Sequence, residues 1–169
     1  MLELKILGIV VLASFLGGVI GLERELADKA AGMRTHMLVA AAAALFISLS
    51  NLIVPTLEIG HNLVQIDPLR MIEALVAGIA FLGAGTIIRH QSNVAGLTTA
   101  ASLLLVGGVG ITVGLSQYAL AAGLTALTLI ILRGVKPVED WIIRRATGKD
   151  PKSDSEPNPP DSEDPANAE

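Results

Sequence analysis

Long apolar runs separated by short polar segments constrain this 169-residue chain more than any other feature. A run of roughly 17–20 apolar residues is long enough for a helix to cross about 30 Å of hydrocarbon at about 1.5 Å per residue. Hydrophobic residues make up 51% of the chain and the mean hydropathy is +0.61, which is typical of a membrane protein. We therefore predict an all-α, polytopic membrane protein with about five transmembrane helices. The predicted helices cover residues 4–22, 36–54, 68–88, 97–115 and 118–132.

The ends of these runs carry helix signals. Asp67 followed by Pro68 is typical of an N-cap and a first helical residue, so the third helix is expected to begin there. Pro55 is expected to close the second helix, and Thr98 or Thr99 to cap the start of the fourth. With these boundaries no predicted helix contains an internal proline, and we expect no proline kink.

The basic residues predict on which side of the membrane each connection lies. If the N-terminus is outside, five crossings leave only Lys5 and Arg70 on the outer side. This bias follows the positive-inside rule, so the C-terminus is expected in the cytoplasm. The residues predicted on the inner side are Arg24, Lys29, Arg34, Arg89, Arg133, Lys136, Arg144, Arg145, Lys149 and Lys152.

The composition divides the chain into three segments. Residues 1–135 form the predicted transmembrane domain. Residues 136–149 are basic, and form either a short interfacial helix with Trp141 facing lipid or a stop-transfer flank without a defined fold. Residues 150–169 contain seven acidic residues and five of the eight prolines, which predicts a disordered acidic tail.

Polar residues at the inner ends of the helices are the candidate functional residues. Charges this close to hydrocarbon are costly unless they are paired or hydrated, so we expect Glu23 to pair with Arg24 or Arg34. Asn93 is expected to hydrogen-bond across helices or to stabilise the tight link that it occupies. The alternative is that the charges only set topology in the headgroup layer. The predicted cytoplasmic vestibule comprises Glu23, Arg24, Arg34, Thr35, His36, Arg89, Asn93, Thr98 and Thr99.

Glycines inside the apolar runs predict close contacts between helices, because small residues let backbones approach each other. The alternative for residues 81–86 is a broken helix of the transporter type, in which freed carbonyl groups meet an ion. Glu73, in the same run, either binds a cation or reaches out to water. The glycines predicted to pack are Gly17, Gly21, Gly78, Gly83 and Gly85.

The sequence lacks the patterns of several enzyme and metal-site classes. It contains no phosphate loop, nucleophile elbow or HExxH pattern. Its three His residues are scattered and it has no Cys, so we expect no metal site and no cofactor. Ser14, Ser48 and Ser102 have no evident His partner, which argues against an intramembrane serine protease. We therefore expect that the protein is not an enzyme.

Two stretches resemble the signatures of the MgtC/SapB family of membrane proteins. Residues 17–38, GGVIGLERELADKAAGMRTHML, are similar to the first signature, in which a Gly-rich span precedes ERE and RTH segments. Residues 67–101 are similar to the second, through DPxR, GIxFLGAG and NVxGLTTAA in that order. The resemblance covers about residues 4–135. The chain departs from the family pattern at Ala42, Ala74, Ala95 and Leu104, where Gly, Gln, a basic residue and an aromatic residue are usual. Many members also have a folded cytoplasmic C-terminal domain where this chain has the acidic tail.

The resemblance implies a bacterial inner-membrane protein linked to growth under magnesium limitation and, in pathogens, to survival inside host cells. It also implies action on other membrane proteins, with ATP synthase as a proposed target, more than magnesium pumping. We therefore predict a small membrane regulatory protein whose partners are the lipid bilayer, another membrane protein complex and, as an option, a second copy of the chain. No nucleic-acid partner is expected.

Two other classes of function stay open at this point. A cation transporter or channel would use Glu73 and the glycine-rich third helix. A structural partner would pack on a neighbouring protein through Gly17 and Gly21 or through Gly110 and Gly114.

Overall fold

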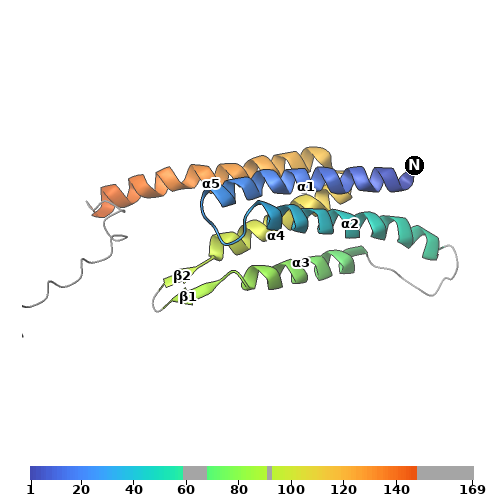
Figure 1. The fold of residues 1–169 in the computed structure, drawn as a ribbon, viewed down its shortest axis with the longest axis horizontal. Coiled ribbons are helices and arrows are strands. Elements are labelled where there is room, and N and C mark those ends of the chain that lie inside the picture. Colours follow the sequence, from blue (N-terminus) through green and yellow to red (C-terminus); the bar gives the residue numbers. More distant parts are fainter. Residues whose placement is uncertain (59–67, 91–92, 148–169) are drawn as a thin grey trace, which may run out of the picture. The chain divides into compact units, whose positions relative to one another are not determined.

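The computed structural model describes residues 1–58, 68–90 and 93–147. Within these ranges the chain forms helices and one β-hairpin, so the prediction of an all-α protein holds with one small sheet added (Figure 1). Two compact units are separated after Leu132. The elements are α1 (Leu2–Leu26), α2 (Met33–Glu58), α3 (Pro68–Ala84), β1 (Ile88–His90), β2 (Asn93–Ala95), α4 (Leu97–Gly114) and α5 (Tyr118–Thr147).

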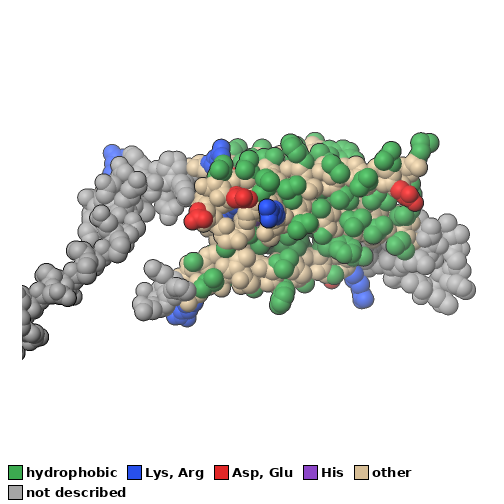
Figure 2. Space-filling view, in the orientation of Figure 1, with side chains coloured by type: hydrophobic (Ala, Val, Ile, Leu, Met, Phe, Trp, Pro, Cys, Tyr) green, Lys and Arg blue, Asp and Glu red, His purple; other side chains and the backbone are tan. Residues whose placement is uncertain are grey.

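Helices long and apolar enough to cross a membrane are found at three places in the described chain: Leu2–Leu26, Met33–Ile53 and Leu97–Gly114. Tyr118–Gly134 is a shorter apolar helix. Figure 2 shows hydrophobic side chains over most of one face, with acidic and basic side chains mainly toward its ends. This distribution fits a membrane protein, because a lipid-facing surface must be apolar across the hydrocarbon.

Helices α1, α2 and α4 form the packed centre of the first unit, and we call them the three-helix core. Its buried side chains include Ile20 of α1, Ala40 of α2 and Val106 of α4, each 0% exposed. α3 lies against α4, and α5 reaches α4 where Leu124 lies beside Gly108. The described polar cluster lies in the three-helix core, and α3 is peripheral to it.

Two glycines of α1 bring its backbone against α2. A Cβ atom on Gly17 would lie 2.6 Å from the carbonyl oxygen of His36, and one on Gly21 would lie 2.6 Å from the Cα of Met33. Such short separations do not occur between real atoms, so a larger residue at either position would force the helices apart. The predicted packing role of Gly17 and Gly21 is therefore seen in their contacts.

Two glycines of α4 also bring its backbone against α2. A Cβ on Gly110 would collide with the carbonyl oxygen of Ala40, and one on Gly114 would lie 2.8 Å from the Cβ of Ile47. We call Gly17, Gly21, Gly110 and Gly114 the glycine interface. These glycines pack inside the chain, so the alternative of a structural partner held through them finds no support in their contacts.

The glycines of α3 differ from one another. Gly83 faces Ala100 of α4, whose Cβ would lie 3.3 Å from an added Cβ, which is a close helix contact. Gly78 has no atom within 4 Å of that position, and the neighbours of Gly85 are the carbonyl groups of Leu82 and Phe81 in its own turn. The prediction of helix packing is therefore wrong for Gly78 and Gly85. α3 contacts α4 through Gly83 and also through Ile79, whose side chain a Cβ on Gly107 would collide with.

Two predicted helix ends are also wrong. α2 continues through Pro55 to Glu58, and α5 continues through Pro137 to Thr147, so prolines do lie inside helices. Proline removes one backbone hydrogen bond, and membrane helices tolerate this loss where neighbouring groups satisfy the freed carbonyl. Pro68 begins α3 as predicted. Asp67 and the predicted tail, residues 150–169, lie outside the described residues.

The third helix ends earlier than predicted, at Ala84 instead of near Ile88. The hydroxyl of Thr86 donates to the carbonyl oxygen of Gly83 at 2.7 Å, and a turn then leads into β1. β1 pairs antiparallel with β2. The helix does not resume after Gly85, so the alternative of a transporter-type broken helix at residues 81–86 is not what this segment forms.

Gly96 joins the hairpin to α4 and is its N-cap, so the predicted capping by Thr98 or Thr99 is wrong. Its φ of +93° is in a region that favours glycine. A Cβ there would also collide with the carbonyl oxygen of Thr86. The close approach of the hairpin base to α4 therefore requires glycine at this position.

Candidate functional site

The last turn of α1 carries charged residues into the three-helix core. The connection between the predicted helices 4–22 and 36–54 is shorter in the structure, because α1 extends to Leu26 and α2 begins at Met33. This extension keeps Glu23 and Arg24 on the helix, where they are 8% and 3% exposed. We predicted both residues at the inner ends of the helices, and the structure buries them between the helices of the core.

Arg24 connects α1 to α4. Its Nη2 donates a hydrogen bond of 3.1 Å to the hydroxyl oxygen of Thr99. Its Nη1 lies 4.0 Å from Oε2 of Glu23, so the predicted pairing is with Arg24 and is a loose one. Oε2 of Glu23 and Nε of Arg24 have no hydrogen-bond partner among the described residues. Two charges are thus buried with only part of their bonding capacity used.

His36 connects α2 to α4. Its Nε2 lies 3.1 Å from the hydroxyl of Ser102, and its Nδ1 lies 2.9 Å from the carbonyl oxygen of Gly32. The Ser102 hydroxyl also donates to the carbonyl oxygen of Thr99 at 2.8 Å. Since a carbonyl only accepts, the neutral ring carries its proton on Nδ1. The single hydroxyl proton of Ser102 is then shared between Nε2 and the Thr99 carbonyl.

We call this set the polar cluster: Glu23, Arg24, His36, Thr99 and Ser102. It links all three helices of the core through one chain of contacts, from α1 through Thr99 and Ser102 of α4 to His36 of α2. Each of its residues is buried. The hydrogen bonds hold the helix ends in one relative position, because each replaces an otherwise unsatisfied buried polar group.

The other predicted vestibule residues lie at the same end of the molecule but face outward. Arg34, Thr35, Arg89 and Thr98 are exposed. Asn93 pairs with His90 in the register of the hairpin, and the orientation of its side chain is outside the described structure. Figure 1 shows the connection between α1 and α2 and the hairpin at one end of the helices. The predicted vestibule is therefore two sets of residues, one buried and one exposed.

A hollow of about 410 Å³ lies at this end between the start of α2, the end of α3 and α4. Thr35 is the one predicted vestibule residue in its lining, beside Thr86 and apolar side chains such as Phe81 and Leu103. The hollow is thus mainly apolar, which differs from the polar vestibule that the sequence suggested.

Glu25 has a separate task at the start of α2. Its Oε2 accepts a hydrogen bond of 2.8 Å from the backbone N–H of Met33, the first residue of that helix. A carboxylate here satisfies a free N–H group and lies at the positive end of the helix dipole. The connection between α1 and α2 is therefore fixed by side chains from both sides.

Ser102 is the residue that sequence reasoning missed, and the ground for setting it aside was wrong. It does have a His partner, His36, which is 66 positions away in the chain. The available signal was its spacing from Thr99, because residues three apart lie on one face of a helix. No group of three or more potential metal ligands of the His, Cys, Asp or Glu type occurs within the described residues.

Comparison with known proteins gives one family. The MgtC family matches residues 10–141. The "putative magnesium transporter YhiD" of Escherichia coli (strain K12) is 37% identical over 123 residues, which are 72% of this chain and 56% of the relative. "Protein MgtC" of Salmonella typhimurium (strain LT2) is 42% identical over 120 residues, 71% of this chain and 46% of the relative.

"Protein MgtC" of Brucella abortus is 37% identical over 126 residues, 75% of this chain and 49% of the relative. The chain thus spans about half the length of the curated relatives that it matches. No solved structure matches it.

Proposed function

The chain belongs to the MgtC family, and from this premise we propose that it is a small regulatory protein of the bacterial inner membrane. The family and the names of the relatives connect it with magnesium. Under the proposal it acts on other membrane proteins when magnesium is limiting. It spans the membrane five times, with the N-terminus outside and the C-terminus in the cytoplasm, as the distribution of basic residues favours.

One observation carries the choice of regulation over transport: the polar cluster is sealed by the helices around it. Arg24 is 3% exposed and His36 is 0% exposed. An ion path needs polar groups along an opening. Here the polar groups bond one helix to another, and the glycine interface brings the helix backbones into contact. Such a cluster is suited to fixing the shape of the inner end.

The exposed residues at that end then form the surface that acts on a partner. Arg34 and Arg89 provide positive charge there, and Thr35 and Thr98 provide hydroxyl groups. The partner in this proposal is another membrane protein complex, and the family resemblance makes ATP synthase the first to test. Because His36 and Ser102 are buried and already bonded within the core, we also propose that this pair is structural and that the protein is not an enzyme.

The test is growth of a deletion strain at limiting and ample Mg²⁺, with variants supplied in place of the lost protein. The wild-type protein and Lys29→Ala, an exposed charge in the connection between α1 and α2, are expected to restore growth at limiting Mg²⁺. Arg34→Ala and Asn93→Ala are expected to insert at normal levels and to fail. Normal growth with both variants at normal protein level would contradict the assigned surface. Equal growth of the deletion strain at both Mg²⁺ levels would remove the link to magnesium.

Transport of Mg²⁺ is the second candidate function, because the Escherichia coli relative carries the name "putative magnesium transporter". Glu73 is the acidic residue that this function would use, and it is exposed on α3. Transport requires only this protein and a membrane, whereas regulation requires a partner. Ion movement through vesicles that contain the purified protein alone separates the two.

A further inference from the structure

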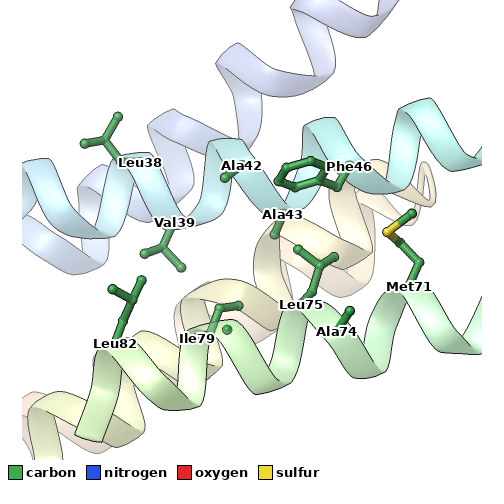
Figure 3. A pocket seen from close by; sticks show the side chains of 11 residues that line it. Leu38, Val39, Ala42, Ala43, Phe46, Met71, Ala74, Leu75, Ile79 and Leu82 are labelled. Carbon is green, nitrogen blue, oxygen red and sulfur yellow. The ribbon is translucent and has the colours of Figure 1, made fainter. Parts of the chain in front are cut away.

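α2 and α3 are separated by an apolar groove of about 490 Å³ (Figure 3). Phe46 and Met71 lie at one end of it, and Val39 and Leu82 lie at the other, as Figure 3 shows. Its lining side chains are all hydrophobic, and several are well exposed, such as Leu38 at 70% and Phe46 at 48%. The polar cluster does not take part in this groove, so it requires its own explanation.

The dimensions of the groove suit one hydrocarbon chain. Met71 and Leu82 are eleven positions apart on α3, which corresponds to about 16 Å along the helix axis. The hydrocarbon thickness of a single leaflet is about 15 Å, half of the bilayer core. An extended acyl chain of one leaflet can therefore lie along the groove, in contact with its hydrophobic lining.

A positive charge lies at one end of the groove. Arg70 precedes Met71, and it lies one turn before Ala74, which lines the groove on the same side of α3. It is exposed and forms no ion pair with Glu73 in the described chain. A guanidinium group matches the phosphate of a lipid headgroup through charge and paired hydrogen bonds. The cation thus lies where the headgroup would be if a chain filled the groove.

We propose that the groove between α2 and α3 binds one acyl chain of an anionic phospholipid, with the phosphate held by Arg70. The site stands apart from the regulatory surface at the inner end, and it does not depend on the proposed function. Gly78 lines this groove. A Cβ atom added to Gly78 would have no atom within 4 Å, and this free space is part of the proposed site.

The test uses full-length protein in vesicles of phosphatidylethanolamine and phosphatidylglycerol. A trace of the phosphatidylglycerol carries a photoreactive diazirine in the middle of one acyl chain. After irradiation, labelled residues are mapped by mass spectrometry. Label is expected to concentrate on Phe46 and Leu75 of the groove, above the level on Leu127 and Ile130, exposed apolar residues of α5. Even labelling of groove and α5 would overturn the proposal.

Variants make the test specific. Gly78→Leu fills the groove and is expected to reduce groove labelling to the level of α5. Gly123→Leu is the matched control, because Gly123 also has open space around it and lies on α5, and it should leave the labelling unchanged. Arg70→Gln should weaken labelling about fivefold, as expected for one basic residue at a membrane surface.

Three results would count against the proposal. Groove labelling that survives Gly78→Leu would overturn it. Labelling unaffected by Arg70→Gln would overturn the contact with the headgroup. Groove labelling that is low at high protein density and rises when the protein is diluted among the lipids would assign the groove to a second copy of the chain instead.

Discussion

The three-helix core and the α3 side of the first unit are built from similar residues but pack in opposite ways. In the core, glycines remove side chains where backbones meet, and Gly110 leaves no space for even a methyl group beside Ala40. On the α3 side, Gly78 faces open space and apolar side chains surround a groove. Glycine content alone therefore does not indicate tight packing in a membrane helix. The partner across the interface decides what each glycine does.

Polar residues follow the same division. Arg24, His36, Thr99 and Ser102 are buried where the core helices meet, whereas Arg70, which precedes the groove residue Met71, is exposed. Buried polar groups without lipid or water contact bond to one another because the alternative is an unsatisfied group in an apolar medium. The core is thus specified by hydrogen bonds and close contacts, and the α3 side keeps a surface that a ligand can cover.

The largest predicted effect comes from removing the charge that the core buries. Arg24→Ala leaves the Glu23 carboxylate buried without its cation, and we expect a loss of about 3–5 kcal/mol in the free energy of unfolding. Arg34→Ala, an exposed charge at the same end, should change it by less than about 0.5 kcal/mol. Unfolding of both variants in mixed micelles of mild detergent and dodecyl sulfate gives the comparison. Equal stability of the two variants would show that the cluster does not hold the core.

Removing only the hydroxyl oxygen that accepts the hydrogen bond from Arg24 should lower the free energy of unfolding by less. Thr99→Val keeps the shape of the side chain and takes away the oxygen that accepts from Arg24, for an expected cost of about 1.5–3 kcal/mol. Thr98→Val, at an exposed neighbouring position, is the control and should be close to neutral. The same unfolding measurement applies. A neutral Thr99→Val would mean that the bond between α1 and α4 contributes little.

A single methyl group tests the glycine interface. Gly110→Ala places a Cβ against the backbone of α2, and we expect a loss of about 1–3 kcal/mol from overpacking. Thermal unfolding followed by circular dichroism in detergent measures this change. A Gly110→Ala protein as stable as the wild type would show that the contact between Gly110 and Ala40 does have space for a methyl group.

The smallest change in the free energy of unfolding is expected for a substitution on α3, and this substitution should stabilise the protein. Gly78→Ala meets nothing within 4 Å and replaces a flexible residue inside a helix, so it should stabilise the protein by about 0.5–1 kcal/mol. Gly123→Ala offers the same open space on α5 and serves as a second reference. Destabilisation by Gly78→Ala would show that α3 packs more closely than its surroundings indicate, and the contrast between the two sides would disappear.

The sequence predicts the helical runs well because hydrophobicity over a membrane-long window is a strong signal. It does not predict where α1 ends. We predicted Glu23 and Arg24 outside the first helix because charged residues usually mark a membrane surface. The hydrogen bond from Arg24 to Thr99, 75 positions away, shows that the helix continues and that these residues enter the core. The hairpin was missed for a related reason, since three-residue strands carry almost no periodic pattern.

The candidate site was predicted in part. Glu23, Arg24, His36 and Thr99 were singled out because they adjoin apolar runs, and the structure joins them in one cluster. Ser102 was set aside because its spacing from Thr99 places the two on one face of a helix but does not show that His36 lies opposite that face. The groove between α2 and α3 was not predicted at all, since a space between helices depends on how they are arranged and not on the pattern of either helix.

Movement of Mg²⁺ into vesicles that contain only the purified full-length protein tests the central claim most directly. A Mg²⁺-sensitive dye inside the vesicles reports entry after external Mg²⁺ is added. A regulatory protein with a sealed core predicts entry no faster than into protein-free vesicles, at any Mg²⁺ concentration. Saturable entry that is lost in Glu73→Gln would contradict the account and identify the protein as a transporter.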